Sequence, residues 1–478
     1  MSKEKIVKTD VGSKTGQNKC PKCGATEISL NQKKGKLVCH FCRHEFDPEK
    51  VEGLEKSKAL EGKIIASGAV DIDKDASDTV TLKCTSCGAE VVVDTSSITQ
   101  ARCHWCRNTL SINEQIPNGS VPDVVLPFKT EKEDAKTKIK EFVGKRKFYA
   151  HPKFKKEFTV DNIMGVYLPY MLVDVNLHAN LKGKGEHQTR TYTRGTGDDK
   201  KRYYDADLYD VERDFDLTID DLTIESSTDK LNTRSNKTNN IINSILPFDT
   251  ENCVKYDSNY IRGFTSEKRD TNISDLSNIA VMQSKDVARF AANDSLEHYD
   301  RGVAWSEENV EVKGEQWKAA YLPVWLYSYM QKKGNKQLLH YVAVNARTNE
   351  TMGSVPIHYP KLLFISSLIE MVCIYLTYLC SIGADSDDSN GYLFLLLGGI
   401  IYFLIIYAKY RNTGARHMHE SETKNELSNL KKKDVFVKRE IGLTNSMISG
   451  VNNKNVTGSI VSNNFTKDIL DSVKKELK

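Results

Sequence analysis

The residues that decide the architecture are 362–384, LLFISSLIEMVCIYLTYLCSIGA, and 391–410, GYLFLLLGGIIYFLIIYAKY. Each run has about twenty residues, which is enough to cross a hydrocarbon core about 30 Å thick. Between them stands the polar link DSDDSN, which is so short that the two helices must be antiparallel neighbours. A buried hairpin of a soluble protein is the alternative, but core helices are usually shorter. The sequence therefore predicts two transmembrane helices that form a hairpin.

Charges beside the two runs predict their orientation. The link carries three aspartates and no base, whereas Lys361, Lys409 and Arg411 flank the outer ends. Basic residues near membrane helices favour the cytoplasmic side, so we expect both termini in the cytoplasm. The first thirty residues contain no apolar segment of the kind found in signal peptides. We therefore expect a multi-pass cell-membrane protein with most of its mass on the cytoplasmic side.

Eight of the 11 cysteines form four C-x-x-C pairs, arranged as an internal duplication. Fifteen residues separate Cys23 of CPKCG from Cys39 of CHFC, and CTSCG and CHWC repeat this pattern 64 positions further on. In a reducing cytoplasm such pairs indicate metal binding rather than disulfides. Four thiolates suit a tetrahedral Zn²⁺ ion, and the β-prone runs between the pairs predict small zinc ribbons. The ligands expected for two structural zinc ions are Cys20, Cys23, Cys39 and Cys42 in residues 20–46, and Cys84, Cys87, Cys103 and Cys106 in residues 81–112.

A closed four-cysteine site has no coordination position for a reacting water, which argues against zinc catalysis. A redox role would favour one C-x-x-C pair at the start of a helix in a βαβ unit, and the ribbon spacing differs from that arrangement. The sequence also contains no nucleophile elbow, dinucleotide-binding loop, Walker loop, HExxH motif or kinase signature. We therefore expect no catalytic residues and no enzymatic activity.

The two ribbon regions differ in charge, which bears on nucleic-acid binding. Residues 1–60 hold 13 basic and 8 acidic side chains, whereas residues 61–120 hold 5 basic and 8 acidic ones. Lys33, Lys34 and Lys36 of the first ribbon are candidates for contact with an anionic ligand. Because phosphate contacts dominate non-specific nucleic-acid binding, the acidic second ribbon favours a protein partner over nucleic acid.

Residues 122–360 contain a second, fainter duplication. VVLPF at 124–128 precedes VYLPYMLVDV at 166–175, and SILPF at 244–248 precedes AYLPVWLYSY at 320–329. A stretch with helical spacing follows each LPF, and alternating aromatic and aliphatic residues follow each YLP. The segments expected around the ribbons are therefore a flexible tail (1–19), a linker (47–80) and two copies of one α+β unit (122–240 and 241–360).

Two further features accompany the predicted membrane segments. Residues 411–478 hold 13 basic and 8 acidic side chains, including Lys431, Lys432 and Lys433, so this cytoplasmic tail either lies in solvent or contacts anionic lipid. Its end, NFTKDILDSVKKELK, has apolar residues at four-residue spacing and predicts an amphipathic helix. Glu370 stands inside the first apolar run, where a carboxylate is costly. We expect Glu370 to contact the second helix or, in a homo-oligomer, another copy of the chain.

These features together resemble a family of bacterial membrane proteins with an N-terminal transcription factor IIB-type zinc ribbon. The resemblance rests on CPKCG/CHFC and CTSCG/CHWC, on the LPF and YLP motifs, and on the C-terminal hairpin, and it spans most of residues 20–410. Members are often mislabelled as primosomal protein N-prime-like helicases, although no helicase motif occurs in this sequence. The resemblance implies a membrane anchor in envelope-stress systems, with phage-shock-protein-A-like and flotillin-like (SPFH) partners.

The sequence thus predicts a multidomain chain with two small β zinc ribbons, a duplicated α+β domain and a C-terminal two-helix transmembrane hairpin. The expected function is that of a non-enzymatic, zinc-binding membrane adaptor that recruits cytoplasmic proteins to the inner face of the membrane. The alternative is a membrane-tethered regulator whose first ribbon contacts nucleic acid or RNA polymerase.

Overall fold

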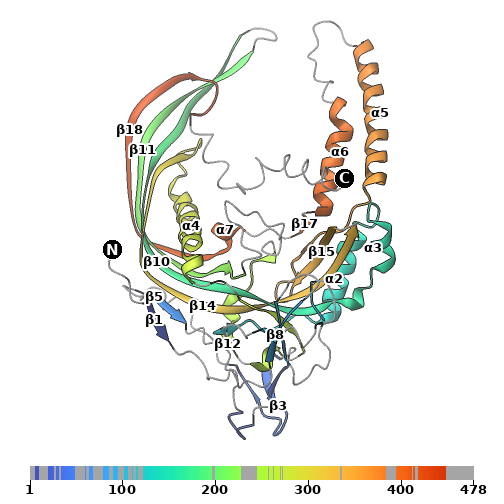
Figure 1. Cartoon of the computed structure of the whole chain (residues 1–478). Coiled ribbons are helices and arrows are strands. Elements are labelled where there is room, and N and C mark those ends of the chain that lie inside the picture. Colours follow the sequence, from blue (N-terminus) through green and yellow to red (C-terminus); the bar gives the residue numbers. More distant parts are fainter. Residues whose placement is uncertain are drawn as a thin grey trace.

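Long antiparallel strands dominate the protein, which Figure 1 shows as a computed structural model. The structure describes residues 6–9, 20–25, 28–31, 34–48, 60, 64–67, 79–84, 90–94, 102–105, 110, 115–116, 122–195, 200–227, 245–256, 258–261, 263–269, 271, 273–333, 336–383, 395–411, 413–414 and 418–447. Lys33, Cys87, Cys106 and the predicted C-terminal amphipathic helix lie outside the described residues.

Four strands form the curved part of the main sheet, which we call the arm: β10 (Met164–Arg194), β11 (Lys201–Glu225), β14 (Val303–Lys333) and β18 (Lys424–Leu443). β10 pairs with β14 on one side and β11 on the other, and β18 adds to β11, all antiparallel. β10 has 31 residues, far more than the typical five or six. Alternate residues such as Leu177, Ala179 and Leu181 are fully buried, as expected when one face of a sheet is covered.

The two copies of the predicted α+β unit share this one sheet. Leu168 of the first YLP motif lies opposite Leu322 of the second, so the motifs pair with each other in antiparallel fashion. The helix that follows the first LPF is α2 (Lys132–Gly144), and the corresponding helix of the second copy is α4 (Ile273–Ala292). α4 lies against the inner face of the arm (Figure 1). The two copies therefore pair with each other through their YLP motifs.

Shorter strands extend the sheet at its edges, and a second sheet stands apart. The main sheet also contains β1 (Ile6–Thr9), β5 (Ile64–Ser67), β6 (Thr79–Lys83), β7 (Glu90–Asp94), β8 (Gln115–Ile116), β9 (Val124–Val125), β12 (Val254–Lys255), β13 (Thr265–Glu267), β15 (Lys336–Asn345), β16 (Thr351–Gly353) and β17 (Thr413–Gly414). β2 (Ile28–Asn31), β3 (Lys36–Cys39) and β4 (Glu45–Phe46) form the separate sheet of the first ribbon. The remaining helices are α3 (Pro152–Glu157), α5 (Tyr359–Gly383), α6 (Gly398–Arg411) and α7 (His419–Glu422).

Part of the predicted N-terminal tail is a strand. β1 pairs in parallel with β5, with Ile6 aligned to Ile64 and Val7 to Ile65, and β5 in turn pairs with β14. The prediction of a flexible tail over residues 1–19 is therefore wrong for residues 6–9. Their partner residues lie in the segment between the ribbons, far away in the sequence, so the local sequence does not predict the pairing of β1 with β5.

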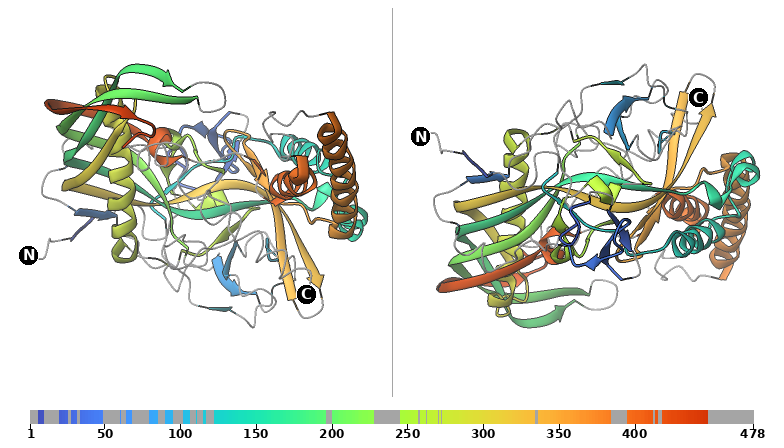
Figure 2. Two further views of the ribbon diagram at one scale, coloured as in Figure 1. Left: turned by 90° about the horizontal axis from the view of Figure 1, so that it is seen from above. Right: turned by 90° about the horizontal axis from the view of Figure 1, so that it is seen from below.

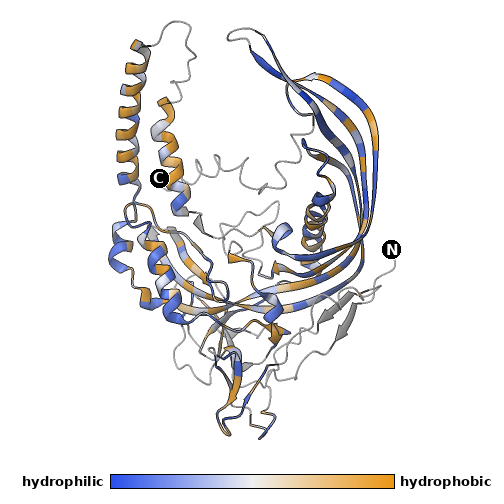
Figure 3. Cartoon of the chain, turned by 180° about the vertical axis from the view of Figure 1, so that it is seen from behind, coloured by the Kyte–Doolittle hydropathy of each residue, from blue (hydrophilic) through white to orange (hydrophobic). Residues whose placement is uncertain are grey.

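Among the described residues, α5 is the one helix that is long and apolar enough to cross a membrane, over Tyr359–Cys380. Figure 3 shows α5 coloured as hydrophobic along most of its length, whereas hydrophobic and hydrophilic residues alternate along the arm. α6 packs beside α5, and its apolar stretch, Leu395–Tyr410, is shorter. Its C-terminal end belongs to the body, because Tyr407 and Tyr410 are buried in the core. Part of the run that was predicted as a second span therefore packs against protein.

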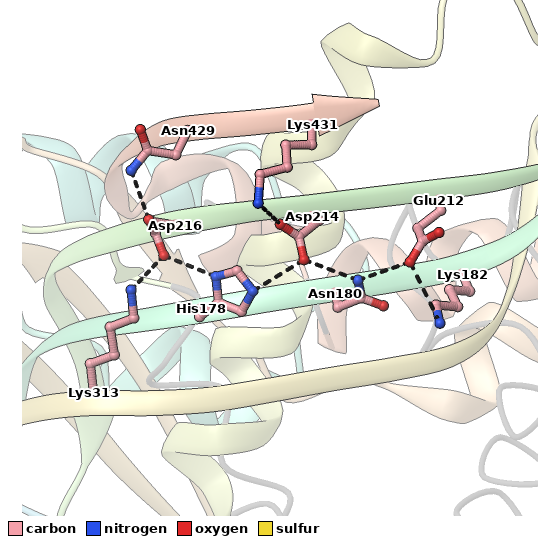
Figure 4. A network of polar contacts seen from close by, with 9 residues as sticks. All are labelled: His178, Asn180, Lys182, Glu212, Asp214, Asp216, Lys313, Asn429 and Lys431. Carbon is pink, nitrogen blue, oxygen red and sulfur yellow. Dashed lines mark hydrogen bonds and ion pairs between the residues drawn. The ribbon is translucent and has the colours of Figure 1, made fainter. Parts of the chain in front are cut away.

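The prediction of a basic tail over residues 411–478 is wrong for Lys424–Leu443, which forms β18 at the edge of the arm. Opposite charges face each other across β11 and β18. Buried Arg213 donates to both carboxylate oxygens of Asp434, at 2.6 and 3.2 Å. On the exposed side, Lys431 Nζ lies 3.2 Å from Asp214 Oδ1, and Lys433 Nζ lies 3.9 Å from Glu212 Oε2. Opposite charges on neighbouring strands stabilise their pairing. Figure 4 shows the resulting polar network, which comprises His178, Asn180, Lys182, Glu212, Asp214, Asp216, Lys313, Asn429 and Lys431.

The arm and the pair α5–α6 stand on opposite sides of the body (Figures 1 and 2). Both rise from the body in the same direction, while the first ribbon, marked by β3, lies at the other end of the molecule (Figure 1). The apolar helix and the first ribbon are thus far apart in the fold.

Candidate metal centre

Four thiols converge at one end of the first ribbon. The sulfur atoms of Cys20, Cys23, Cys39 and Cys42 all lie within 4.8 Å of one another. The Cys20–Cys42 and Cys23–Cys39 sulfur distances are 3.6 and 3.5 Å. Four thiolates about 2.3 Å from a tetrahedral Zn²⁺ are separated by about 3.8 Å, so the spacing fits this ion. The group is therefore positioned to hold a metal ion.

Two equivalent backbone turns bring these thiols together. The N–H of Gly24 donates to the carbonyl of Cys20, and the N–H of Arg43 donates to the carbonyl of Cys39, both at 2.8 Å. Gly24 and Arg43 each follow the second cysteine of a pair and have φ values of 74° and 58°. Glycine adopts this left-handed conformation readily, whereas Arg43 does so at a cost that metal binding by the neighbouring thiols can offset.

The electrostatics of the four thiols favour a bound cation. Burial opposes ionisation of Cys20, but N–H groups of Cys23 and Lys22 donate to its sulfur, and its pKa falls to about 7. The N–H of Ala25 donates to the Cys23 sulfur and lowers its pKa. Desolvation and the three other sulfur atoms have the larger combined effect and raise the pKa of Cys23 to about 12. The Cys20 thiolate is thus stabilised by the protein itself, whereas ionisation of Cys23 is favoured by a positive charge beside it.

The second ribbon is built into the main sheet. Its strands β6 and β7 form a hairpin, and β7 pairs with β13. Cys84 and Cys103 are buried, while the other two predicted ligands, Cys87 and Cys106, lie outside the described residues. The structure therefore describes only two of the four predicted ligands of the second ribbon.

The knuckle sequences CHFC and CHWC have opposite environments. Trp105 is 6% exposed and packs edge-on against Tyr341 with ring centres 5.6 Å apart, and the hydroxyl of Ser328 donates to the carbonyl of His104 at 2.6 Å. The equivalent Phe41 of the first ribbon is 81% exposed. The first ribbon instead contacts the body through its own sheet, since Ile28 joins the same hydrophobic core as the α2 side chains. Its knuckle therefore remains accessible.

The lysines that we considered for anion binding are already paired where the structure describes them. Lys34 Nζ lies 2.8 Å from Glu45 Oε1, and Lys36 Nζ lies 3.3 Å from Asp47 Oδ2. These exposed pairs contribute little stability, but they reduce the positive charge that a nucleic acid would meet.

A cluster of buried acidic residues was not predicted from the sequence. Asp174, Asp220 and Asp221 place carboxylate oxygens within 4.8 Å of one another, at a bulge in the β10–β11 pairing where Asp220 and Asp221 stand opposite the single residue Asp174. Lys318 Nζ lies 2.7 Å from Asp174 and 3.5 Å from Asp221. Burial, aided by Asp221 and Asp174, raises the pKa of Asp220 to about 7. The adjacent aspartates in DLTIDDLTIE interrupt the strand alternation, and this was the available signal.

Glu370 lies at the contact between α5 and α6. Its Oε2 atom accepts a hydrogen bond of 2.6 Å from the N–H of Gly399, in the first turn of α6. A carboxylate at a helix N-terminus satisfies a free N–H and interacts favourably with the helix dipole. The helices approach so closely that a Cβ atom on Gly399 would collide with the Ser366 carbonyl.

No protein family, curated protein or solved structure matches this chain. The family resemblance that the sequence motifs suggest therefore stays a prediction.

Proposed function

We propose that this protein is a non-enzymatic membrane adaptor that recruits cytoplasmic proteins to the inner face of the membrane through its first zinc ribbon. The observation that carries the proposal is the exposed knuckle at Phe41, whose duplicate, Trp105, packs into the protein's own sheet. In the second ribbon this position packs against the rest of the same chain. The equivalent position of the first ribbon is exposed, so it is available to bind another protein.

We assign two structural zinc ions to each chain, one in each ribbon. The first ligand set has the spacing and electrostatics described above. The second repeats its sequence 64 positions later. Four protein ligands fill a tetrahedral ion, so the metal stabilises the ribbon and has no position left for a substrate.

We further propose that α5 and α6 both enter the membrane, with the N- and C-termini in the cytoplasm. The length and hydropathy of Tyr359–Cys380 and the acidic link after it support this arrangement. Among partners, phage-shock-protein-A-like and SPFH-like proteins follow from the motif resemblance. The alternative, a regulator that binds nucleic acid, has less support because Lys34 and Lys36 are paired.

Affinity purification of the full chain from detergent-solubilised membranes tests the proposal. We expect a protein to co-purify in stoichiometric amount with the native chain, and Phe41→Ser to lose it. Met282 of α4 is also an exposed hydrophobic residue, at 45%, so Met282→Ser serves as the matched control and should retain the partner. Absence of a stoichiometric protein, or equal recovery with Phe41→Ser, would contradict the proposal. A nucleic acid recovered in its place would support the alternative.

A further inference from the structure

Lysine side chains gather at the foot of α5. Lys361 is the third residue of α5, and the others come from α3 and from the turn between α2 and α3, which lie beside that foot in Figure 1. We call this cluster the lysine collar; it comprises Lys147, Lys155 and Lys361.

The collar carries positive charge without acidic partners. In the part of the chain that the structure describes, no carboxylate lies within ion-pair distance of any collar lysine. Lys136 of α2 differs, because its Nζ lies 2.6 Å from Glu133 and 3.0 Å from Asp161. Lys136 thus has acidic partners, whereas the collar lysines have none among the residues that the structure describes.

Two collar ammonium groups even share one acceptor. Lys361 Nζ donates to the carbonyl of Phe148 at 3.1 Å, and Lys155 Nζ donates to the same oxygen at 3.4 Å. Burial and then the charges of Lys361 and Lys147 lower the pKa of Lys155. Each ammonium group has three donors, so most of them stay available to an anion with several oxygens.

Apolar side chains accompany the collar. Phe148 is 59% exposed, and Lys361 Nζ lies 3.6 Å from the centre of its ring. Phe364, one helical turn along α5, is 70% exposed. Lysine lays its apolar stem along apolar surface while its charged end stays in water, so lysines beside exposed phenylalanines suit the boundary between a bilayer and water. A soluble phosphate would meet only the charged part of this surface, whereas a phospholipid would meet both parts.

We propose that the lysine collar binds the phosphate headgroup of an anionic phospholipid in the leaflet at the foot of α5. This inference rests on the membrane insertion of α5 that is part of the proposed function. It also replaces the C-terminal lysines as the lipid contact, because Lys431 and Lys433 face carboxylates of β11.

The test uses the full chain in nanodiscs of phosphatidylcholine and phosphatidylglycerol, with a spin label on one lipid at a time. The fraction of immobilised label gives the preference for phosphatidylglycerol. We expect the native chain to prefer it, and the triple variant Lys147→Gln, Lys155→Gln, Lys361→Gln to lower that preference at least about fivefold, since one base near an anionic surface contributes about this factor.

Two matched variants separate charge at the collar from charge in general. Lys22→Gln, Lys34→Gln, Lys36→Gln removes the same charge from the first ribbon and should keep the native preference. The triple arginine variant at positions 147, 155 and 361 should also keep it. An unchanged preference in the triple glutamine variant would overturn the proposal, as would displacement of the labelled lipid by millimolar inorganic phosphate.

Insertion is measured separately by resistance of the vesicle-bound chain to extraction with carbonate. A chain that resists extraction but shows no lipid preference refutes the collar and leaves the membrane adaptor intact. A chain that is extracted refutes the membrane insertion and the collar together.

Discussion

At the scale of single residues, Phe41 is 81% exposed, whereas the equivalent Trp105 is 6% exposed. Both stand at the same position of a C-H-x-C knuckle, and both are large aromatic residues. Their exposure is decided by the strands around them: the second ribbon adds β7 to the main sheet, whereas the first keeps a separate sheet. The approach of Cys20, Cys23, Cys39 and Cys42 to one another follows from their spacing, which is a local property of the chain.

Asp220 provides a test at the same scale. Its pKa of about 7 lies well above the value near 3.9 of an unfolded chain, so the folded protein retains a proton that the unfolded chain has lost. Stability therefore falls as pH rises from about 4 to about 7 and does not recover above it. Asp220→Asn removes this cost.

We expect Asp220→Asn to melt at a higher temperature than the native protein at pH 8, with the difference shrinking toward pH 4. Thermal unfolding at several pH values measures it. Asp210, an exposed aspartate of the same strand, gives the control Asp210→Asn, which should change little. A variant that is less stable than the native chain at pH 8 would show that ionised Asp220 stabilises the fold.

Glu370 tests the contact of α5 with α6. Glu370→Leu leaves the N–H of Gly399 without its acceptor, and an unsatisfied buried N–H costs about 1–3 kcal/mol. We expect a lower melting temperature in detergent, whereas Glu370→Gln keeps an acceptor oxygen and should lose less. If Glu370→Leu unfolds like the native protein and keeps its oligomer size and insertion, the contact has no structural role.

At the scale of elements, the metal sites give the clearest prediction. Metal binding supplies folding free energy to a ribbon of this size, so Cys20→Ser should release one zinc ion and unfold the first ribbon. Native mass spectrometry should count two zinc ions in the native chain and one in Cys20→Ser. Fewer than one ion per native chain would refute the assignment.

The predicted elements depend on patterns among neighbouring residues, whereas the missed ones depend on contacts between residues far apart in the sequence. The ribbons, α2, α4 and α5 follow from local spacing and periodicity. The edge strand β18 of the arm does not, because its partner strand β11 lies far away in the sequence, with 217 positions between Asp214 and Lys431. The second apolar helix was predicted, but the packing of its C-terminal half against the body was not, because Tyr402 and Tyr410 contact Tyr149, which is far away in the sequence.

At the scale of the whole molecule, the arm and α5 rise in the same direction from the body (Figure 1). A bilayer around α5 would reach the level of the arm, whose surface includes charged residues such as Arg190 and Arg194. Charged side chains do not enter hydrocarbon without a large cost. Anchoring therefore requires α5 and α6 to tilt away from the arm.

Collision of spin labels with relaxing agents tests this arrangement in nanodiscs. A label at Thr193 of the arm should respond to a water-soluble nickel complex, and a label at Ile374 of α5 should respond to oxygen dissolved in the bilayer. A label at Thr193 that responds mainly to oxygen would show the arm inside the membrane and contradict the account.

The most direct test of the adaptor uses a photo-reactive phenylalanine analogue placed at position 41 or at position 105 of the full chain in intact cells. We expect position 41 to cross-link to another protein, and position 105 to cross-link within the chain, to the strand that carries Tyr341. The cross-linked peptides are identified by mass spectrometry. Absence of any intermolecular product at position 41, with the expected internal product at position 105, would contradict the central claim.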